Sequence, residues 1–175
     1  LIIALAHGLT VALIISSLGH ISGAHINPAV TIGFLITKKI KFKTALSYLF
    51  AQITGSIFAS ICLLILIPNS LDFSLGGQSL NEGVGFFNAI IIEMILTFLL
   101  VLSIFGVAVD NRGPMKYISG FGIGLVVTID IFAGGPLTGA SMNPARTFGP
   151  SLISANWDNH LVYWIGPIWG GILAS

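Results

Sequence analysis

The sequence predicts an all-α, multi-pass membrane protein in which two halves are inverted repeats of each other. Three observations predict this fold class: an apolar composition, five long apolar segments, and one motif that occurs twice. Of the 175 residues, 55% are hydrophobic and only 7% are charged, whereas about a quarter of the residues in a soluble domain are charged. A soluble bundle of this size would have too little polar surface to stay dissolved. We therefore expect one transmembrane domain over residues 1–175.

Five segments approach or reach the roughly 20 apolar residues that a helix needs to cross about 30 Å of hydrocarbon. These predicted spans are Leu1–Leu18, Thr44–Ile67, Val84–Val109, Tyr117–Ala133 and Leu161–Ser175. The chain begins inside an apolar segment, and its last span is short. We therefore expect it to be a piece of a longer protein.

Basic residues predict the side of the membrane that each connection faces. Six of the seven basic residues fall in two connections that lie on the same side, two spans apart: Lys38, Lys39, Lys41, Lys43, Arg112 and Lys116. By the positive-inside rule this side is cytoplasmic. The seventh, Arg146, lies in an apolar connection on the outer side and needs a separate explanation. The net charge of +1 argues against a nucleic-acid partner.

The motif that occurs twice defines the internal repeat. Gly19–Phe34 (GHISGAHINPAVTIGF) matches Gly135–Pro150 (GPLTGASMNPARTFGP) at eight of sixteen positions. One copy follows a span that runs inward and the other a span that runs outward, so the repeat is inverted, as in many transport proteins. The repeats cover residues 1–67 and 84–175. Only the second has two spans before its motif, so a sixth span is expected upstream of Leu1.

Each copy of the motif contains an Asn-Pro pair that predicts the start of a helix. Asn favours the N-cap, where its side-chain oxygen accepts a hydrogen bond from a backbone N–H, and Pro favours the first helical residue. The predicted helices, Pro28–Thr37 and Pro144–Ser154, are about 15 Å long, half the thickness of a bilayer. With their oxygens used in capping, Asn27 and Asn143 are expected to point their NH₂ groups away as spare donors. Two positive helix ends and two amides would then converge at the bilayer centre.

The segments before these helices, Gly19–Ile26 and Gly135–Met142, are predicted to be non-helical. Unpaired backbone is costly in lipid, so they must line a wet cavity or be buried in protein. Gly23 and Gly139 permit the backbone conformations that such segments need. A column of carbonyl groups leading to central donors suits a small hydrogen-bonding molecule better than a cation.

Two segments, SGAHINPAV (Ser22–Val30) and TGASMNPAR (Thr138–Arg146), resemble the paired signature of the aquaporin (major intrinsic protein) family. The resemblance continues through NHLVYWIGP and the spacing of Glu93 and Thr97, so it covers essentially the whole chain. It is closest to the plant vacuolar-type (tonoplast intrinsic) water channels. It implies a right-handed bundle of six spans, five of them present here, with two re-entrant half-helices and one pore in each subunit of a homotetramer.

The resemblance also implies roles for individual residues. The paired signature falls on Asn27, Pro28, Ala29, Asn143, Pro144 and Ala145, with Asn27 and Asn143 as the central pore donors. The carbonyl ladder falls on Gly23, Ala24, His25, Gly139, Ala140 and Ser141. The selectivity filter falls on His7, Ile131, Ala140 and Arg146. Glu93 resembles a structural carboxylate that holds a pore loop.

The implied function is a passive channel for water that excludes protons and ions. A filter with His7 but with Ile131 and Ala140 resembles that of vacuolar-type channels, several of which also pass ammonia, urea or hydrogen peroxide. Glycerol-conducting relatives generally have Asp after the filter Arg, whereas Thr147 stands here. A glycerol-type facilitator and an inverted-repeat secondary transporter remain the alternatives. Protonation of His7 would place a second cation at the filter, which makes pH sensitivity a hypothesis.

Other residues leave questions open. Asp130 adjoins the filter and is expected to be neutral, to pair with a group on an adjacent helix, or to contact another subunit. For a transporter, Glu93 and Asp130 are the only candidate coupling carboxylates. His20 and His25 lack a second ligand set, so no metal site is predicted. No cofactor motif or pair of nucleophile and base indicates an enzyme. The sequence does not distinguish a plasma membrane from a vacuolar one.

Overall fold

The computed structural model describes residues 1–112 and 118–175, which form helices joined by loops, with no strand in these two ranges. Lys116 and Tyr117, predicted to lie in a cytoplasmic connection and at the start of a span, fall outside the described residues.

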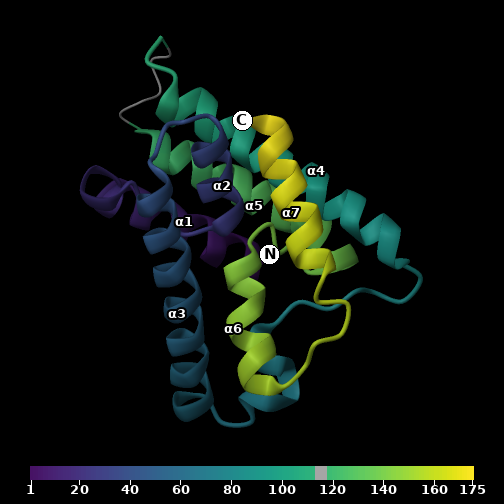
Figure 1. Ribbon diagram of the computed structural model, residues 1–175. Coiled ribbons are helices and arrows are strands. Elements are labelled where there is room, and N and C mark those ends of the chain that lie inside the picture. The colour runs from purple at the N-terminus through teal and green to yellow at the C-terminus, as the bar shows by residue number, and fades with distance from the viewer. Residues whose placement is uncertain (113–117) are drawn as a thin grey trace.

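Nine helical elements follow one another along the described chain (Figure 1). They are α1 (Ile2–Ser22), α2 (Pro28–Ile36), α3 (Phe42–Leu66), the 3₁₀ helix η1 (Ser70–Gly76), α4 (Phe86–Ile104), the π-helical turn η2 (Phe105–Val109), α5 (Ser119–Thr138), α6 (Pro144–Ser154) and α7 (Val162–Ala174). Four of these are long and apolar enough to cross a membrane: α1, α3, α4 with η2, and α5. The fifth predicted span is the shorter apolar helix α7, with 13 residues.

The helix before the first motif copy is longer than predicted. Gly19–Ile26 was expected to be non-helical, but α1 continues to Ser22. It ends at Gly23, whose φ of 76° is left-handed and whose N–H donates to Gly19 O at 2.9 Å. Glycine is the residue that adopts this conformation most readily, so the second glycine of the motif, and not the first, ends the helix.

The helix before the second copy differs from the prediction in the same way. Gly135–Met142 was expected to be non-helical, but α5 continues to Thr138 with Pro136 inside it. Gly139 ends the helix with a φ of 78°, and its N–H donates to Gly135 O at 3.0 Å. In both copies, therefore, the non-helical backbone covers only the five residues from the left-handed glycine to the Asn.

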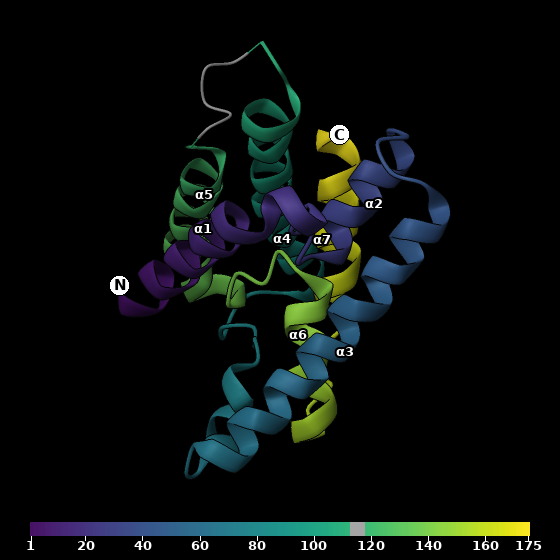
Figure 2. The same ribbon diagram turned by 90° about the vertical axis from the view of Figure 1, so that its left-hand side faces the viewer.

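The two short helices start in the middle of the molecule and point to opposite ends. Figures 1 and 2 show α2 running from the centre toward the end where α4 finishes and α5 begins, and α6 running toward the end that holds η1. Helix α6 has the predicted bounds, and α2 ends at Ile36, one residue before the prediction. The adjoining N-terminal ends of the two short helices position the candidate site.

Close helix pairs enclose this centre. Helix α1 packs along α5, and α4 packs along α7. Glycines allow the close approach of the backbones: a Cβ at Gly124 of α5 would lie 2.3 Å from Gly8 O of α1, and a Cβ at Gly170 of α7 would lie 2.3 Å from Met94 O of α4. The main apolar core joins residues of α1, α2, α4 and α5, including Val30, Leu100, Ile123, Val127 and Ile131.

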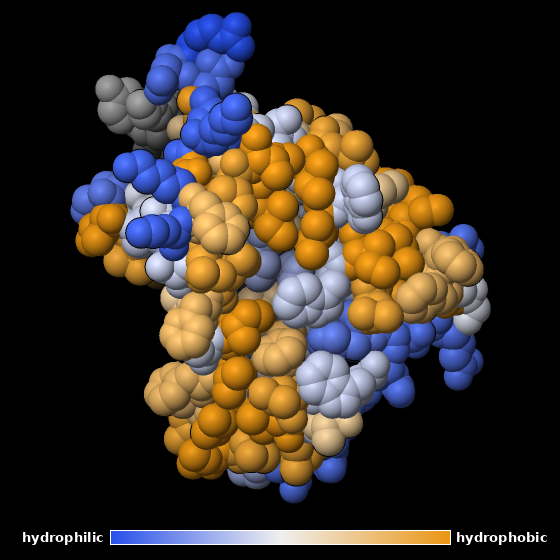
Figure 3. All heavy atoms as spheres, in the orientation of Figure 1, coloured by the Kyte–Doolittle hydropathy of each residue, from blue (hydrophilic) through white to orange (hydrophobic). Residues whose placement is uncertain are grey.

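Apolar residues cover much of the face of the bundle that Figure 3 shows. Large side chains such as Leu13, Phe50, Phe58 and Ile65 are more than 65% exposed. Exposed apolar surface on this scale is stable only in contact with lipid or with another subunit. The chain is therefore an integral, multi-pass membrane protein.

A groove beside α3 has no counterpart in the second half. Gly55 begins the sequence GSIFAS in α3, and Gly170 begins GGILAS in α7. A Cβ at Gly170 would meet α4, whereas a Cβ at Gly55 would meet nothing within 4 Å. Gly55 lines an open groove between α1 and α3, together with Ile14, Ser22, His25, Tyr48 and Gln52. Helix α4 packs against α7 at Gly170, but no helix of the described residues packs against α3 at the corresponding Gly55.

Candidate functional site

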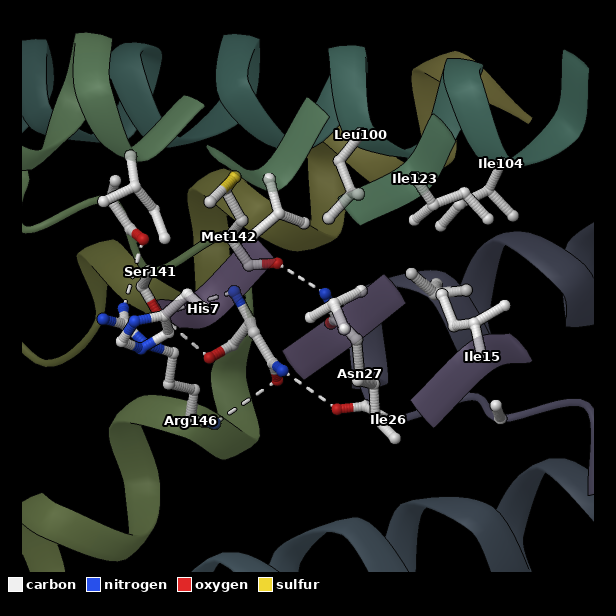
Figure 4. Close-up of a pocket in the computed structure, with 17 residues that line it drawn as sticks. His7, Ile15, Ile26, Asn27, Leu100, Ile104, Ile123, Ser141, Met142 and Arg146 are labelled. Carbon is white, nitrogen blue, oxygen red and sulfur yellow. Dashed lines mark hydrogen bonds between the residues drawn. The ribbon is translucent and has the colours of Figure 1, made fainter. Parts of the chain in front are cut away.

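A cavity lies where the two short helices meet (Figure 4). Most of its wall is apolar, formed by Val11, Ile15, Val30, Leu100, Ile104, Ile123, Val127 and Ile131. The polar groups in the wall are few and come from the predicted site: His7, Asn27, Ser141, Asn143 and Arg146, with the backbone at Ala24 and Ala140. Residues far apart in the sequence are thus brought to one channel-like space.

Both asparagines cap their helices. Asn27 Oδ1 accepts a hydrogen bond from the N–H of Ala29 at 2.9 Å. Asn143 Oδ1 accepts from the N–H groups of Ala145 at 3.1 Å and Arg146 at 3.3 Å. Pro28 and Pro144 each occupy the first helical position, where a missing N–H costs nothing. The Asn-Pro pairs therefore fix where each short helix begins.

Each of the two amide nitrogens already donates one hydrogen bond within the protein. This corrects the prediction that both NH₂ groups are entirely spare. Asn27 Nδ2 donates to Met142 O at 2.7 Å, and Asn143 Nδ2 donates to Ile26 O at 2.9 Å (Figure 4). Each asparagine thus binds the loop of the opposite repeat. Because an amide NH₂ carries two hydrogens, one donor per asparagine remains for a molecule in the cavity.

The guanidinium of Arg146 lies at one end of the cavity beside His7. Its Nε donates to His7 Nε2 at 3.3 Å, and its Nη1 lies 3.1 Å from Ala140 O and 3.5 Å from Gly139 O. His7 Nδ1 lies 2.9 Å from Ile3 O, a carbonyl that can only accept, so Nδ1 carries the proton and Nε2 is an acceptor. This arrangement holds a neutral imidazole against the charged guanidinium.

The other two predicted filter residues lie in the same cavity wall. Ile131 and Ala140 line the same cavity and are 7% and 0% exposed. Their side chains add no hydrogen-bonding group. This end of the cavity thus has one cation, one imidazole and two apolar side chains.

Gln78 is a residue of this site that the sequence did not reveal, because its loop lies outside both motif copies. With its amide oxygen facing Arg146, Gln78 accepts from Nη1 at 2.6 Å and Nη2 at 3.1 Å and donates to Thr147 Oγ1 at 2.6 Å. A Cβ on Gly139 would lie only 3.0 Å from the Gln78 side chain. The loop is tied to α5 nearby, where Asn81 Nδ2 donates to Pro136 O at 2.8 Å.

Glu93 of α4 holds the loop of the second repeat. Its Oε1 accepts from Thr138 Oγ1 at 2.7 Å and from the N–H of Ser141 at 2.8 Å, and its Oε2 accepts from the N–H of Met142 at 2.7 Å. Glu93 is 0% exposed. These bonds fix the loop that carries the second set of predicted ladder carbonyls.

The loop of the first repeat is held differently. Gln52 of α3 donates through Nε2 to His25 O and to Thr31 Oγ1, the latter at 2.8 Å. The ring of His25 packs edge-on against Phe34 and Tyr48, with centroids 4.2 and 5.2 Å away. Within the described part of the chain, His25 Nδ1 and the Gln52 Oε1 are buried without a hydrogen-bond partner. Among the described residues, no carboxylate accepts hydrogen bonds from this first loop as Glu93 does from the second.

Two further cavities adjoin the central one, on either side of it. The cavity toward the predicted cytoplasmic end includes Gly23 and His25 and shares Ile15, Ala24, Val30, Ile104 and Ile123 with the central cavity. The cavity at the other end includes Gln78 and Gly139 and shares Ile131 and Arg146 with it. The predicted ladder residues are distributed over all three.

Asp130 does not belong to this row of cavities, although it is next to Ile131 in the sequence. It is 2% exposed, and its Oδ2 has no hydrogen-bond partner among residues 1–112 and 118–175. Burial rules out contact between Asp130 and another subunit in this conformation. Within those ranges Asp130 also forms no hydrogen bond or ion pair with an adjacent helix.

The sequence and the fold of this chain are similar to those of known membrane channels. The family described as "Major intrinsic protein" matches residues 1–175. The chain is 43% identical to aquaporin TIP4-4 of Zea mays over 99% of this chain and 68% of that protein, and 38% identical to aquaporin-4 of Bos taurus over 99% and 54%. It thus spans about two thirds of the maize relative and about half of the bovine one. The X-ray structure of the aquaglyceroporin from Plasmodium falciparum superposes with a TM-score of 0.85 at 27% identity, over 98% of this chain and 78% of that one.

Proposed function

The chain belongs to the major intrinsic protein family, and on this premise we propose that it forms a passive transmembrane channel for water. One observation carries the proposal: Asn27, Asn143 and Arg146 line a single, mostly apolar cavity between two oppositely directed half-helices. The named relatives, which include a plant TIP aquaporin and a mammalian aquaporin-4, support water as the first substrate.

The proposed path gives water few but well-placed partners. A molecule in the central cavity meets one free N–H from each asparagine, while apolar side chains cover most of the remaining wall. Few hydrogen bonds have to be broken at each step, so passage is fast. Selectivity then rests on the pore width and on the arrangement of lining donors and acceptors.

Proton and cation exclusion follows from the same donors. A water molecule that accepts from Asn27 and Asn143 turns its oxygen toward both amides, which interrupts a chain of water molecules that could relay a proton. The N-terminal ends of α2 and α6 add positive potential at this point. Arg146 adds a fixed positive charge at the next constriction, so that a cation meets two barriers in series.

The filter suits small neutral solutes as well as water. Ile131 and Ala140 present no polar side chain, and His7 and Arg146 supply donors and acceptors on one side only. We include ammonia, urea and hydrogen peroxide in the proposal. A glycerol-type facilitator is not favoured, since the aquaglyceroporin is more distant at 27% identity than the aquaporins at 38% and 43%.

The structure also offers little to a coupled transporter. The bonds of Glu93 to Thr138, Ser141 and Met142 occupy both carboxylate oxygens. Asp130 is buried outside the central cavity. Passive permeation needs neither carboxylate as a coupling group, and it involves no chemical step.

We further propose that a spanning helix equivalent to α4 covers the groove between α1 and α3. The open environment of Gly55 and the unpartnered buried atoms of His25 and Gln52, within the described residues, support this.

The proposed assembly is a homotetramer with one pore per subunit, as the family resemblance implies. Size measurement in detergent of the full-length protein tests the assembly.

Stopped-flow shrinkage of proteoliposomes tests the function. We expect fast osmotic water flow with a low activation energy and no saturation, urea and ammonia flux above that of empty vesicles, and no proton flux. Arg146→Val should raise the proton and urea flux, whereas Arg112→Gln, with the same charge change in an exposed loop, should not. Water flow equal to that of empty vesicles, in protein shown to be folded by circular dichroism, would refute the proposal.

A further inference from the structure

The turn between α2 and α3 is strongly basic. Within the sequence KKIKFK, four lysines alternate in part with two apolar residues: Lys38, Lys39, Ile40, Lys41, Phe42 and Lys43. All four lysines are exposed. The turn lies at the end of the molecule where α4 finishes and α5 begins, the predicted cytoplasmic side (Figure 1).

These lysine charges are not neutralised by the protein. None of the four forms an ion pair with any residue in the described ranges 1–112 and 118–175. Asp110, an acidic residue in the other predicted cytoplasmic connection, pairs with Arg112 at 2.6 Å. The hydrogen bonds from Arg112 hold the pKa of Asp110 at about 2, so this carboxylate stays charged and engaged. The other acidic residues lie in the interior or in the outer connections: Asp72, Glu82, Glu93, Asp130 and Asp158.

The backbone of the turn is fixed. The N–H of Lys38 donates to Leu35 O at 3.0 Å, and the N–H groups of Lys39 and Ile40 donate to Phe34 O at 2.9 and 3.4 Å. These bonds fold the turn against the end of α2. The lysines are therefore presented from a defined platform, which reduces the entropy lost when they bind a partner.

The turn also lies where the apolar surface of a span begins. Phe42 is 68% exposed, and Leu46 and Phe50, one and two turns along α3, are 58% and 72% exposed. Figure 3 shows hydrophilic surface gathered at this end of α3 and hydrophobic surface along its length. Because long lysine side chains extend from apolar surroundings toward the polar interface, the four ammonium groups would lie at the level of the lipid headgroups.

From these observations we propose that the turn formed by residues 37–43 binds the headgroups of anionic phospholipids in the leaflet that it faces. The ammonium groups would donate hydrogen bonds to the phosphate and carboxylate oxygens of the lipids, while Phe42 and Ile40 contact the upper part of the acyl chains. A cluster of this size next to a span is of the kind that attracts anionic lipids. The proposal does not rest on water conduction, so the two can fail separately.

The test measures lipid selectivity of the full chain in vesicles of phosphatidylcholine that contain a minor fraction of phosphatidylserine. Spin-labelled phosphatidylserine and phosphatidylcholine report the relative association constant at the protein surface. We expect a preference for phosphatidylserine of at least roughly fivefold, the effect of a single lysine near an anionic surface. The preference should decline as the salt concentration rises, because exposed charges are screened.

Replacing all four lysines with glutamine should remove most of the preference, and Lys→Arg at the same positions should retain it. Arg112→Gln is the matched control, because this residue is basic and on the same face but already paired. The helical circular-dichroism spectrum, expected to be unchanged, shows that the variants are folded, and it does so whether or not the protein conducts water. Equal preference in the wild type and the glutamine variant overturns the proposal, as does an equal loss in Arg112→Gln. Binding of soluble polyglutamate without any preference for phosphatidylserine would assign the turn to an acidic protein partner and overturn it too.

Discussion

The two re-entrant loops have the same backbone course but very different support. Each runs from a left-handed glycine to a capping asparagine, with φ values of 76° at Gly23 and 78° at Gly139. The second loop is anchored by Glu93 through three hydrogen bonds in a closed interior. The first is held by Gln52 beside an open groove.

The difference shows that local sequence sets the course of each loop, whereas contacts with distant residues set its support. Gly, Asn and Pro at fixed spacing determine where one helix ends and the next begins, whatever surrounds them. The rigidity of the loop depends on a side chain from elsewhere in the chain. Buried polar backbone without a partner costs free energy, so the first loop should be the more easily deformed of the two.

The largest effect is expected from removing the anchor of the second loop. Glu93→Ala leaves three buried donors without a partner, each worth roughly 1–3 kcal/mol, so the free energy of unfolding should fall by at least about 3 kcal/mol. Water permeability should be nearly lost. Thermal unfolding in detergent and osmotic shrinkage measure the two effects.

The matched variant in the first loop is Gln52→Ala. It leaves His25 O without this donor, but Thr31 Oγ1 keeps its hydrogen bond to Asn27 O at 3.1 Å, so the expected cost is only about 1 kcal/mol. Equal destabilisation by the two variants would show that the support of the two loops does not differ.

The central asparagines provide the second comparison. In Asn27→Asp and Asn143→Asp, a carboxylate oxygen replaces the Nδ2 that now lies 2.7 Å from Met142 O or 2.9 Å from Ile26 O. Repulsion between the oxygens and the added negative charge should lower water permeability at least about tenfold, equivalent to about 1.4 kcal/mol of activation free energy. Proton flux should rise in both.

Asn27→Asp should be the more harmful of the pair. Asn27 is 4% exposed, whereas Asn143 is only half-buried, so a carboxylate at position 143 loses less hydration. The same proteoliposome assay, together with thermal unfolding, compares the two. A larger loss for Asn143→Asp would show that the difference in burial does not decide the effect.

The left-handed glycines give a third, smaller contrast. An L side chain in this conformation costs roughly 1–2 kcal/mol. A Cβ at Gly139 also lies 3.0 Å from Cβ and Cγ of Gln78 and 3.3 Å from its Cα, whereas a Cβ at Gly23 meets the ring of His25 at 3.3 Å. Gly139→Ala should therefore lower the unfolding temperature more than Gly23→Ala. Similar shifts would mean that the Gln78 loop yields as easily as the His25 ring.

The smallest effect is expected for Gln78, which supports the second loop region from outside. Gln78→Ala removes one acceptor from Arg146, which keeps its contacts with His7 and Ala140. The loss of about 1 kcal/mol should increase urea flux relative to water flux a few-fold while stability changes little. Ser79→Ala, at the same outer cavity, is the control, and an unchanged ratio of urea to water flux in Gln78→Ala would remove Gln78 from the filter.

Features encoded by short-range patterns were predictable from the sequence. The family resemblance is confirmed by the match over residues 1–175, and the all-helical membrane fold agrees with the aquaglyceroporin structure at a TM-score of 0.85. The start of each half-helix was predictable because capping involves only neighbouring residues. The ends of α1 and α5 were misplaced because Gly19 and Gly135 remain helical, and sequence alone does not say which of two glycines adopts a positive φ.

Long-range contacts were not predictable in this way. The Gln78 loop shows no repeat and no motif, so its position over Arg146 emerges only from the packing of the loop against α5. The second bond of each asparagine depends on the carbonyl of the other repeat. The burial of Asp130 without a hydrogen-bond partner, within the described residues, also has no signal in its local sequence.

The reciprocal bonds from Asn27 to Met142 O and from Asn143 to Ile26 O have a mechanical consequence. The two halves of the molecule are held together by the same amides that we propose as donors to the permeating molecule. Moving the two halves apart would break both hydrogen bonds and change the orientation of both amides at once. We therefore expect any gate in this protein to act at the two ends of the pathway and to leave the central cavity unchanged.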